Sequence, residues 1–153
     1  MNKRILSTAL ALVLGAGYSF TAFAQAKPET LVKQRQAAMT LQGKYFYAPL
    51  RSMAQGKIPY DAAVVARNAG YLEVLGKMPW DGFNASTKDV KSAALPAVFT
   101  DTAKYKEAEE KLQSEVAKLV AVSKGGDEAT VKAQILAVDK ACGGCHDNFR
   151  EKQ

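Results

Sequence analysis

Apolar residues recur at steps of three and four along four stretches of the chain, which predicts four amphipathic α-helices. The first stretch begins at Lys27-Pro28-Glu29, because proline suits the first helical turn and an early glutamate suits the helix dipole. The helix is predicted to end or kink at Tyr47, just before Pro49. The stripe expected to face the core consists of Leu31, Arg35, Ala38, Met39, Gln42 and Phe46.

The second and third stretches follow a turn cluster at residues 55–59. The second helix is predicted to begin near Asp61, a good N-cap, and to stop at Gly76 and Pro79. Its apolar face is Val64, Val65, Leu72, Leu75 and Met78. The third helix is expected over residues 101–122, with a buried stripe of Tyr105, Ala108, Leu112, Val116 and Leu119. Between them lies a long connection over residues 79–94, and long loops in compact domains are often functional.

The fourth stretch starts at Asp127 and has the spacing of a bundle seam, with steps that alternate between four and three. The positions are Val131, Ile135, Val138, Cys142, Cys145 and Phe149. No segment alternates with period two for long enough to predict a strand. The pattern therefore predicts an all-α fold, an antiparallel up-down-up-down four-helix bundle, and such bundles place cofactors between their helices.

The candidate chemistry lies on the fourth helix, at Cys142-Gly143-Gly144-Cys145-His146. Cys-x-x-Cys-His is the attachment signature of a c-type haem, in which two thiols form thioethers and the histidine binds the iron. A thioredoxin-like motif needs a βαβ setting, and a structural zinc site needs four ligands, whereas this chain has two cysteines and one histidine. The two glycines cost about 1 kcal/mol each in helix propensity, and they keep side chains away from the ring. The motif predicts one haem c in the core of the bundle, attached through both cysteines.

The N-terminus has the pattern of a secretory signal peptide. A basic head with Lys3 and Arg4 precedes an apolar, small-residue-rich segment over residues 5–23, and Ala22-Phe23-Ala24 resembles a cleavage site. A membrane anchor is less favoured, because the apolar segment is short and glycines interrupt it. Residues 1–24 are therefore expected to be removed, leaving residues 25–153 as one domain in the periplasm, without membrane insertion.

The charge of the exported chain favours protein partners rather than nucleic acid. The whole chain has a formal net charge of +6, and loss of Lys3 and Arg4 leaves +4. This is enough to bias encounters with acidic redox partners. Most of the lysines alternate with acids, so no basic stripe for nucleic acid is expected.

A haem signature at the end of a four-helix bundle resembles the class II cytochromes c, and most closely the cytochrome c′ family. Six short sequence patches carry this resemblance and span nearly all of residues 25–153. They are 26–29, Arg35-Gln36 with Met39, 59–63, Pro79-Trp80 with Phe83, Phe99 with Asp101, and 142–150. The last patch, Cys-x-x-Cys-His-Asp-x-Phe-Arg, is specific, whereas each of the other five is weak alone.

The resemblance implies a role for each matching residue. His146 would be the proximal axial ligand, with Arg150 beside its imidazole. Arg35 and Gln36 would lie near the haem propionates, and Met39 would stand over the iron on the distal side. Trp80 and Phe83 would crowd the haem pocket. The resemblance also implies a homodimer formed through the first two helices, and binding of nitric oxide and carbon monoxide.

The residues themselves leave simpler alternatives open. Arg35 could be a snorkelling arginine on an apolar stripe, Trp80 and Phe83 could be plain core residues, and Arg150 could complement the helix dipole. Met39 leaves the largest question open. If it ligates the iron, the haem is six-coordinate and low-spin and the protein is an electron carrier. If Met39 only packs, the iron is five-coordinate and high-spin and binds small gases, and this second interpretation is the one we favour.

An enzymatic function, as a peroxidase or a thiol oxidoreductase, is not expected. His146 is the only histidine of the chain, so no second histidine can act as a distal acid or base. Both cysteines are assigned to the haem, which leaves no free thiol for redox catalysis.

Overall fold

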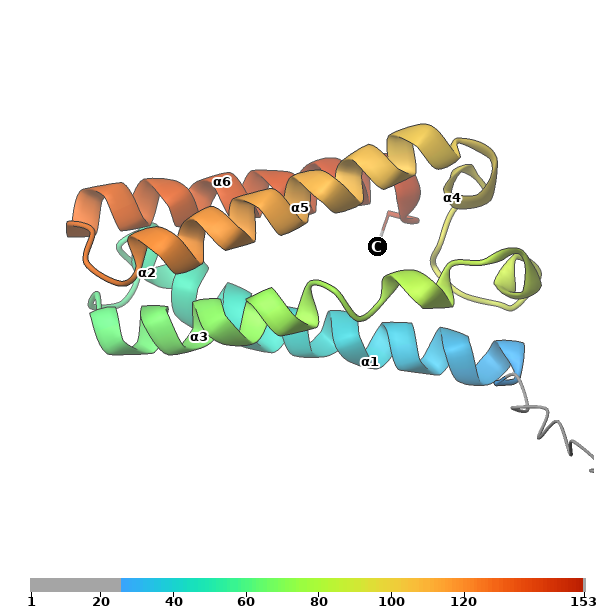
Figure 1. The fold of residues 1–153 in the computed structure, drawn as a ribbon, viewed down its shortest axis with the longest axis horizontal. Coiled ribbons are helices and arrows are strands. Elements are labelled where there is room, and N and C mark those ends of the chain that lie inside the picture. Colours follow the sequence, from blue (N-terminus) through green and yellow to red (C-terminus); the bar gives the residue numbers. More distant parts are fainter. Residues whose placement is uncertain (1–25, 153) are drawn as a thin grey trace, which may run out of the picture.

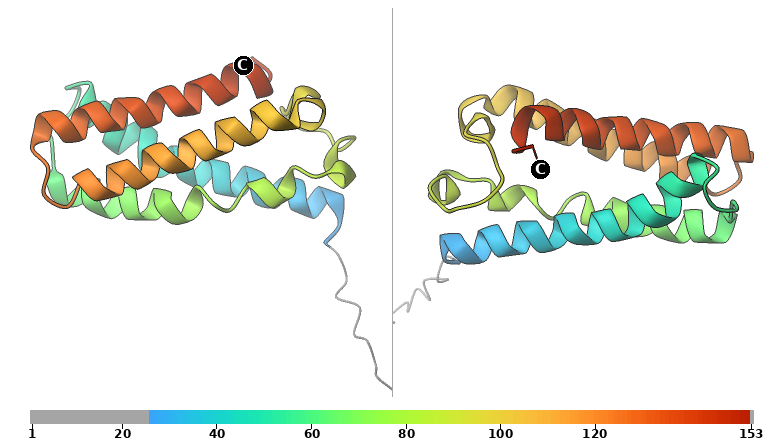
Figure 2. Two further views of the ribbon diagram at one scale, coloured as in Figure 1. Left: turned by 45° about the horizontal axis from the view of Figure 1, so that its top comes forward. Right: turned by 180° about the vertical axis from the view of Figure 1, so that it is seen from behind.

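The computed structural model describes residues 26–152, and within that range it is an antiparallel bundle of four long helices. Figure 1 shows helices that run alternately along the long axis, with α1 and α3 below and α5 and α6 above. The two further views in Figure 2 show the same up-down-up-down arrangement, which confirms the predicted fold class. The four long helices are α1 (Pro28–Phe46), α3 (Ala62–Leu75), α5 (Thr102–Val122) and α6 (Glu128–Phe149).

Helix α1 starts at Pro28 as predicted, and it passes at its other end into a π-helical turn, η1 (Tyr47–Arg51), and then α2 (Ser52–Ala54). Pro49 has no N–H to offer the carbonyl of Tyr45 four residues earlier. The buried side chain of Asn68 from α3 donates to that carbonyl instead, at 3.1 Å. The predicted kink is therefore present, and a hydrogen bond from a neighbouring helix compensates for it.

Helix α3 begins as predicted, because the carboxylate of Asp61 accepts from the backbone N–H of Val64 at 3.0 Å. The helix ends at Leu75, and Gly76 is its C-cap. Met78 therefore lies beyond the helix and is 55% exposed, so its assignment to the buried face was wrong. Met53, in contrast, falls where a turn was expected but is buried in the core from α2.

The long connection between α3 and α5 is built from short turns, η2 (Trp80–Gly82), η3 (Ala85–Thr87) and α4 (Ala97–Thr100). It is tied to the end of α6 by an isolated antiparallel bridge between Ala94 and Arg150. Two hydrogen bonds flank this bridge, from the N–H of Leu95 to the carbonyl of Phe149 at 3.0 Å and from the N–H of Glu151 to the carbonyl of Ala93 at 2.9 Å. Within residues 26–152 no strand is present apart from this bridge.

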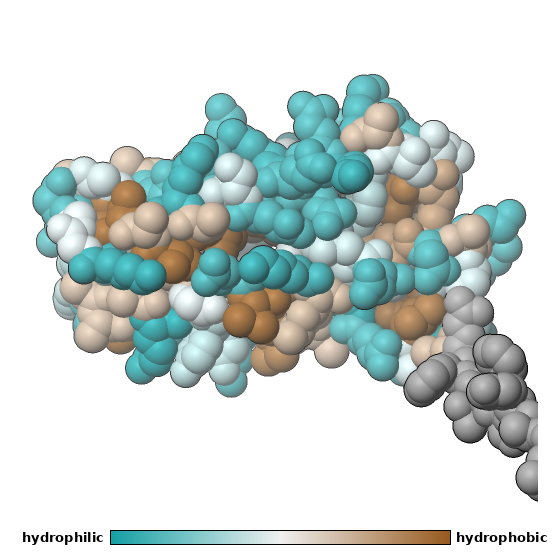
Figure 3. Space-filling view, viewed as in Figure 1, coloured by the Kyte–Doolittle hydropathy of each residue, from teal (hydrophilic) through white to brown (hydrophobic). Residues whose placement is uncertain are grey.

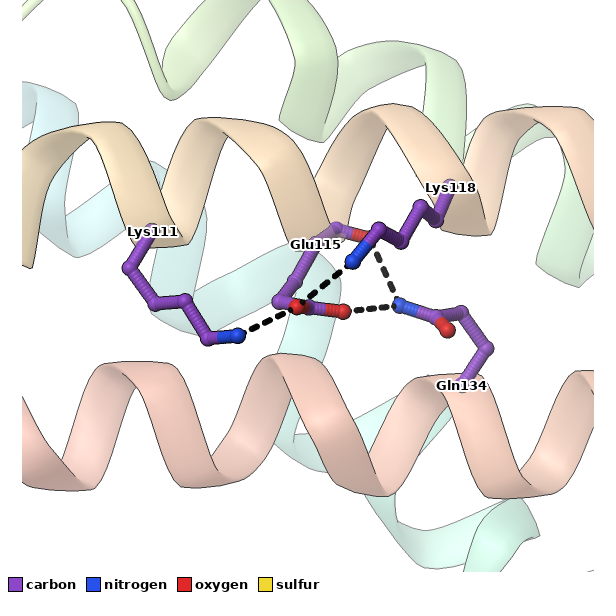
Figure 4. Close-up of polar contacts among 4 residues, drawn as sticks. All are labelled: Lys111, Glu115, Lys118 and Gln134. Carbon is purple, nitrogen blue, oxygen red and sulfur yellow. Dashed lines mark hydrogen bonds and ion pairs between the residues drawn. The ribbon is translucent and has the colours of Figure 1, made fainter.

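Helices α5 and α6 form a hairpin that is joined by a buried polar cluster (Figure 4). Glu115 of α5 is only 5% exposed, and it is ion-paired with Lys111 at 2.8 Å and Lys118 at 3.0 Å. The amide of Gln134 on α6 donates to the same carboxylate at 2.7 Å and to the backbone carbonyl of Glu115 at 2.9 Å. The hydrogen bonds from Lys111, Gln134 and Lys118 lower the pKa of Glu115 to about 2, so the buried carboxylate stays ionised and paired.

The apolar core occupies the half of the bundle that contains α2 and the turn between α5 and α6. Its members are Phe46, Leu50, Met53, Val65, Ala69, Leu72, Leu112, Val116, Leu119, Val131, Ile135 and Val138. On the face in Figure 3, hydrophilic residues cover the half of α5 nearer α4, and hydrophobic surface shows toward its other end and along the seam between α5 and α3. Among the residues described, no helix is both long and apolar enough to cross a membrane.

Candidate haem site

The half of the bundle opposite the core contains a cavity of about 560 Å³ between α1, the long connection, α5 and the last turns of α6. A smaller cavity of about 130 Å³ shares Met39, Trp80, Cys145, His146 and Arg150 with it and reaches toward the core. The two cavities together are lined by all nine residues predicted for the site: Arg35, Gln36, Met39, Trp80, Phe83, Cys142, Cys145, His146 and Arg150. The volume of the larger cavity lies within the range of ordinary ligand sites.

The attachment motif lies on a continuous α-helix, because α6 runs unbroken from Glu128 to Phe149. Cys142 and Cys145 are both half-buried, and neither forms a disulfide. Burial raises the pKa of the Cys142 thiol to about 12, with a smaller contribution from Asp139, and burial raises the pKa of Cys145 as well. The two thiols lie three residues apart on one helix, which is the spacing of a c-type haem attachment motif.

The imidazole of His146 is half-buried at the wall shared by the two cavities. Burial lowers its pKa, and the positive charge of Arg150 lowers it further. The ring is therefore neutral at neutral pH, which is the form that binds a metal. Arg150 is the C-cap residue of α6, and its backbone N–H donates to the carbonyl of His146 at 3.2 Å.

Arg35 is a buried cation whose hydrogen-bond partners are all uncharged. Its side chain is 3% exposed, and it donates to the carbonyl of Gly82 at 2.5 Å, to Thr87 Oγ1 at 3.2 Å and to Ser92 Oγ at 2.9 Å. The carbon of its guanidinium lies 4.1 Å from the centroid of the Phe83 ring. Among residues 26–152 it forms no ion pair with a carboxylate, and burial lowers its pKa. This is not a snorkelling arginine, since its charged end is buried.

An aromatic cluster lines the cavity beside Arg35. The ring of Tyr105 contacts those of Phe83, Phe149 and Trp80, with centroid separations of 5.3, 5.3 and 5.9 Å. The indole N–H of Trp80 donates to the carbonyl of Gly76 at 2.6 Å, and the ring also packs against the apolar core. Trp80 therefore serves both as a core residue and as a wall of the cavity.

Two residues of α1 complete the lining. Met39 is half-buried and faces both cavities, whereas Gln36 is exposed at the rim of the larger one. In Figures 1 and 2, α1 lies on the side of the bundle opposite α6, so Met39 and His146 approach the cavity from different sides.

The sequence did not reveal how the connection is fastened to Arg35. Gly82 packs so closely on α1 that a Cβ there would lie 2.9 Å from both the Cβ of Arg35 and the carbonyl of Leu31. Thr87 and Ser92 were not expected to be functional, because serine and threonine in a polar loop carry no periodic signal. The length of the connection was the only indication that it takes part in the site.

These residues fit haem c. Two thiols and a neutral imidazole on one helix face a cavity with aromatic walls, and a buried guanidinium there has no carboxylate partner among the residues described. A buried cation is costly without an anion, and haem carries carboxylates that can supply one. Among residues 26–152 no group of three or more His, Cys, Asp or Glu side chains is placed to hold a metal ion by itself.

The fold and the cavity define a class of protein, the four-helix-bundle c-type haem proteins whose attachment motif lies on the last helix. The sequence model of cytochrome c′ matches residues 30–150. The chain therefore belongs to the cytochrome c′ family, and its cofactor is haem c.

Individual relatives agree with this assignment. Cytochrome c′ of Rubrivivax gelatinosus is 42% identical over 127 residues, which cover 82% of this chain and 98% of the relative. Its crystal structure superposes with a TM-score of 0.77 over 82% of this chain and 98% of that one, at 40% identity. Cytochrome c′ of Shewanella frigidimarina gives a TM-score of 0.79 at 30% identity, over 84% and 99% of the two chains. A nitric oxide complex of an Alcaligenes xylosoxidans cytochrome c′ variant gives 0.76 at 34% identity, over 84% and 99%.

Proposed function

We propose that the protein is an exported haem protein that binds small diatomic gases, nitric oxide and carbon monoxide, at a five-coordinate iron. The observation that carries the proposal is the pair of cavities between His146 on α6 and Met39 on α1, lined by aromatic and apolar side chains. The nitric oxide complex of the Alcaligenes relative supports the same ligand class. Electron transfer to redox partner proteins is a second use of the same iron, and a mildly basic chain favours acidic partners.

In this proposal Cys142 and Cys145 hold the haem through thioethers, and the neutral imidazole of His146 is the proximal ligand. Bound haem supplies an iron that changes oxidation state and accepts axial ligands, and the protein tunes both properties. Arg150 stays beside the imidazole, where its charge disfavours protonation of His146. Trp80, Phe83 and Phe149 exclude water from the cavity, while Arg35 and Gln36 face the carboxylate end of the haem.

Met39 separates the proposed function from its alternative. If the methionine packs without ligating, the distal side admits small neutral gases and excludes larger or charged molecules. In the alternative, Met39 is the sixth ligand and the protein is a low-spin electron carrier. The family assignment supports the first case, since the Rubrivivax and Shewanella relatives are named cytochromes c′.

Optical spectra of the purified ferric and ferrous protein, with and without carbon monoxide, test the proposal. We expect broad high-spin bands that Met39→Leu leaves in place, and a carbon monoxide adduct in both proteins. The exposed Met78 provides the matched control, Met78→Leu, whose spectra must equal those of the parent. Sharp reduced bands and a methionine–iron charge-transfer absorption that Met39→Leu abolishes would establish the alternative.

Export is the second part of the proposal, and it depends on residues 1–24, which lie outside the described range. The expected cleavage after Ala24 leaves Gln25 as the first residue of a periplasmic protein. N-terminal sequencing and intact mass of the protein from a periplasmic extract test this. A chain that keeps its first residues and stays with the membrane fraction would contradict the signal peptide.

A homodimer is the third part, and exposed apolar residues on α1 and α3 support it. Leu41 of α1, Tyr71 and Val74 of α3, and Met78 just beyond α3 are all exposed. The ring of Tyr71 packs at a tilt against Tyr45 of α1, with the ring centroids 4.9 Å apart. Exposed apolar side chains on two neighbouring helices favour an interface, and a second copy of the chain is its simplest occupant.

Sedimentation equilibrium of Val74→Lys tests the dimer. We expect the variant to become monomeric, because a lysine on each copy would desolvate at the interface. Leu136→Lys, which changes an exposed leucine of α6, provides the control and should leave the mass unchanged. A parent protein that is already monomeric would refute this part alone.

We propose finally that the protein is not an enzyme. The only histidine of the chain is assigned to the proximal site, so no second imidazole is available as an acid or base. Sustained turnover of peroxide or of a disulfide substrate by the purified protein would overturn this.

A further inference from the structure

The hydroxyl of Tyr105 is a buried polar group without a hydrogen-bond partner, and within residues 26–152 it is the only such side-chain atom. A buried hydroxyl that makes no hydrogen bond costs about 1–3 kcal/mol, so native structures rarely leave one unsatisfied. Phenylalanine would fill the same space without this cost. A tyrosine at this position therefore indicates an acceptor that the polypeptide itself does not supply.

The surroundings of the hydroxyl identify the chemistry of that acceptor. Tyr105 lines the same cavity as Cys145 and Arg35, and Phe83 contacts both Tyr105 and the guanidinium of Arg35. The positive charge of Arg35 acts on the pKa of Tyr105, although burial dominates and raises it. The phenol is thus a neutral donor next to a buried cation whose hydrogen-bond partners are all uncharged.

A neutral donor beside an unpaired cation suits an anionic oxygen ligand. A carboxylate can accept from a guanidinium and from a hydroxyl together, because its two oxygens carry several lone pairs. No carboxylate of residues 26–152 pairs with Arg35, and the haem of the proposed function carries carboxylates of its own.

We propose that the Tyr105 hydroxyl donates a hydrogen bond to a haem carboxylate that Arg35 also binds, which makes Tyr105 a positioning residue for the haem. The proposal rests on the proposed haem site. Tyr105 comes from α5 and Arg35 from α1, and Phe83 of the connection contacts both side chains. The carboxylate would therefore add a polar link between these two helices. The thioethers would hold the haem on α6, and this third attachment would hold its carboxylate end against α1 and α5.

The test uses the haem-loaded protein and Tyr105→Phe, which removes only the oxygen. Cells are grown with 5-aminolevulinate labelled with carbon-13 at its carboxyl carbon, which carries the label into the haem carboxylates. Infrared difference spectra of the labelled and unlabelled proteins then isolate the carboxylate bands. Chemical unfolding of both proteins is measured in parallel, and Tyr60→Phe, at a partly buried tyrosine that packs against the core away from the cavity, is the matched control.

We expect a shifted carboxylate band in Tyr105→Phe and an unfolding equilibrium constant about fivefold larger than in the parent, the effect of one lost hydrogen bond. Tyr60→Phe should change neither quantity. The C–O stretch of the carbon monoxide adduct should stay the same in all three proteins.

Unchanged carboxylate bands in a variant that carries covalent haem would overturn the role of Tyr105 and leave the proposed function intact. So would a variant as stable as the parent, or a shift confined to the C–O stretch, which would place the hydroxyl at the gas ligand. Absence of a haem adduct from the parent protein would refute the haem site itself, and the role of Tyr105 with it.

Discussion

The two ends of the bundle solve the problem of a buried charge in different ways. In the core half, Glu115 is surrounded by two lysines and Gln134, so its charge is compensated within the chain. In the cavity half, Arg35 is equally buried but donates only to two hydroxyls and a carbonyl. The charge in the core half is thus paired by the polypeptide itself, whereas the charge in the cavity half needs an anion that a cofactor can supply.

The apolar residues show the same contrast. The core cluster contains fully buried side chains such as Leu119, Val131 and Ile135, and it ends where Cys142 and Trp80 pack against it. Beyond that point the α6 residues that face the cavity include Cys145 and His146, and both are only half-buried. The core half is therefore stabilised by close packing of its own side chains, whereas the cavity half depends on the haem to fill its space.

Removal of the two cysteines that attach the haem should have the largest effect, because it changes the cavity half of the bundle and leaves the core half unchanged. The double variant Cys142→Ala/Cys145→Ala is expected to lose the covalent haem entirely, so the cavity half loses its cofactor while the core half keeps all its residues. Intact mass and visible absorbance of the purified protein measure this. Leu136→Ala, at an exposed position of α6, should keep the adduct, and an adduct in the double variant would contradict the assignment of the cysteines.

In the core half, removal of a buried side chain should lower the free energy of unfolding and leave the haem in place. Leu119→Ala removes a fully buried side chain and is expected to lower the free energy of unfolding by about 2–5 kcal/mol, with the visible spectrum unchanged. Urea unfolding of the haem-loaded protein measures it. Leu136→Ala is again the control, with an expected change below about 0.5 kcal/mol. A visible spectrum altered by Leu119→Ala would show that the two halves are not independent.

Gly82→Ala tests how tightly the connection is held against α1. The added Cβ would lie 2.9 Å from the Cβ of Arg35 and from a backbone carbonyl, so the loop must shift. We expect a loss of about 1–3 kcal/mol in unfolding free energy and altered haem bands, since Arg35 moves with the loop. Gly70→Ala is the matched control, because nothing lies within 4 Å of its added Cβ. Unchanged bands in Gly82→Ala would indicate that the loop does not set the position of Arg35.

Glu115→Gln should have the smallest effect and a distinct pH dependence. The folded pKa of about 2 lies below the ordinary value of 4.5, so the ion pairs stabilise the protein fully above pH 4.5 and lose that contribution as the pH falls toward 2. At neutral pH the variant is expected to lose about 1 kcal/mol, because both lysines are largely exposed. Unfolding free energies measured at several pH values should converge with those of the parent in acid. A difference that stays constant with pH would show that the charge of Glu115 is not what stabilises the hairpin.

Local patterns predicted most of the helices. Pro28, Asp61 and Asp127 mark helix starts in the structure as they do in the sequence, because caps and first-turn residues act within three or four positions. Met78 was assigned to the wrong environment because the helical period was extended past Gly76. Met53 was missed because a three-residue helix has no period to detect.

The nine residues expected at the site line the cavities, since a short motif and a family resemblance mark them, and their roles toward the haem stay predictions. The contacts that connect the site to the rest of the chain were not predicted. The hydrogen bonds from Arg35 to the loop, the amide of Asn68 on a carbonyl of α1, and the unpaired hydroxyl of Tyr105 were not foreseen. The hydrogen bonds join residues more than twenty positions apart in sequence, and periodicity contains no information at that separation. The unpaired hydroxyl likewise follows only from the folded structure.

The bridge between Ala94 and Arg150 has a consequence for how the molecule matures. The loop that holds Arg35 obtains two of its backbone hydrogen bonds from residues that follow the attachment motif. Those residues are synthesised after the attachment motif, so the loop cannot be fastened until the haem-bearing helix has been made. This wall of the pocket therefore closes only after α6 has been synthesised and has folded.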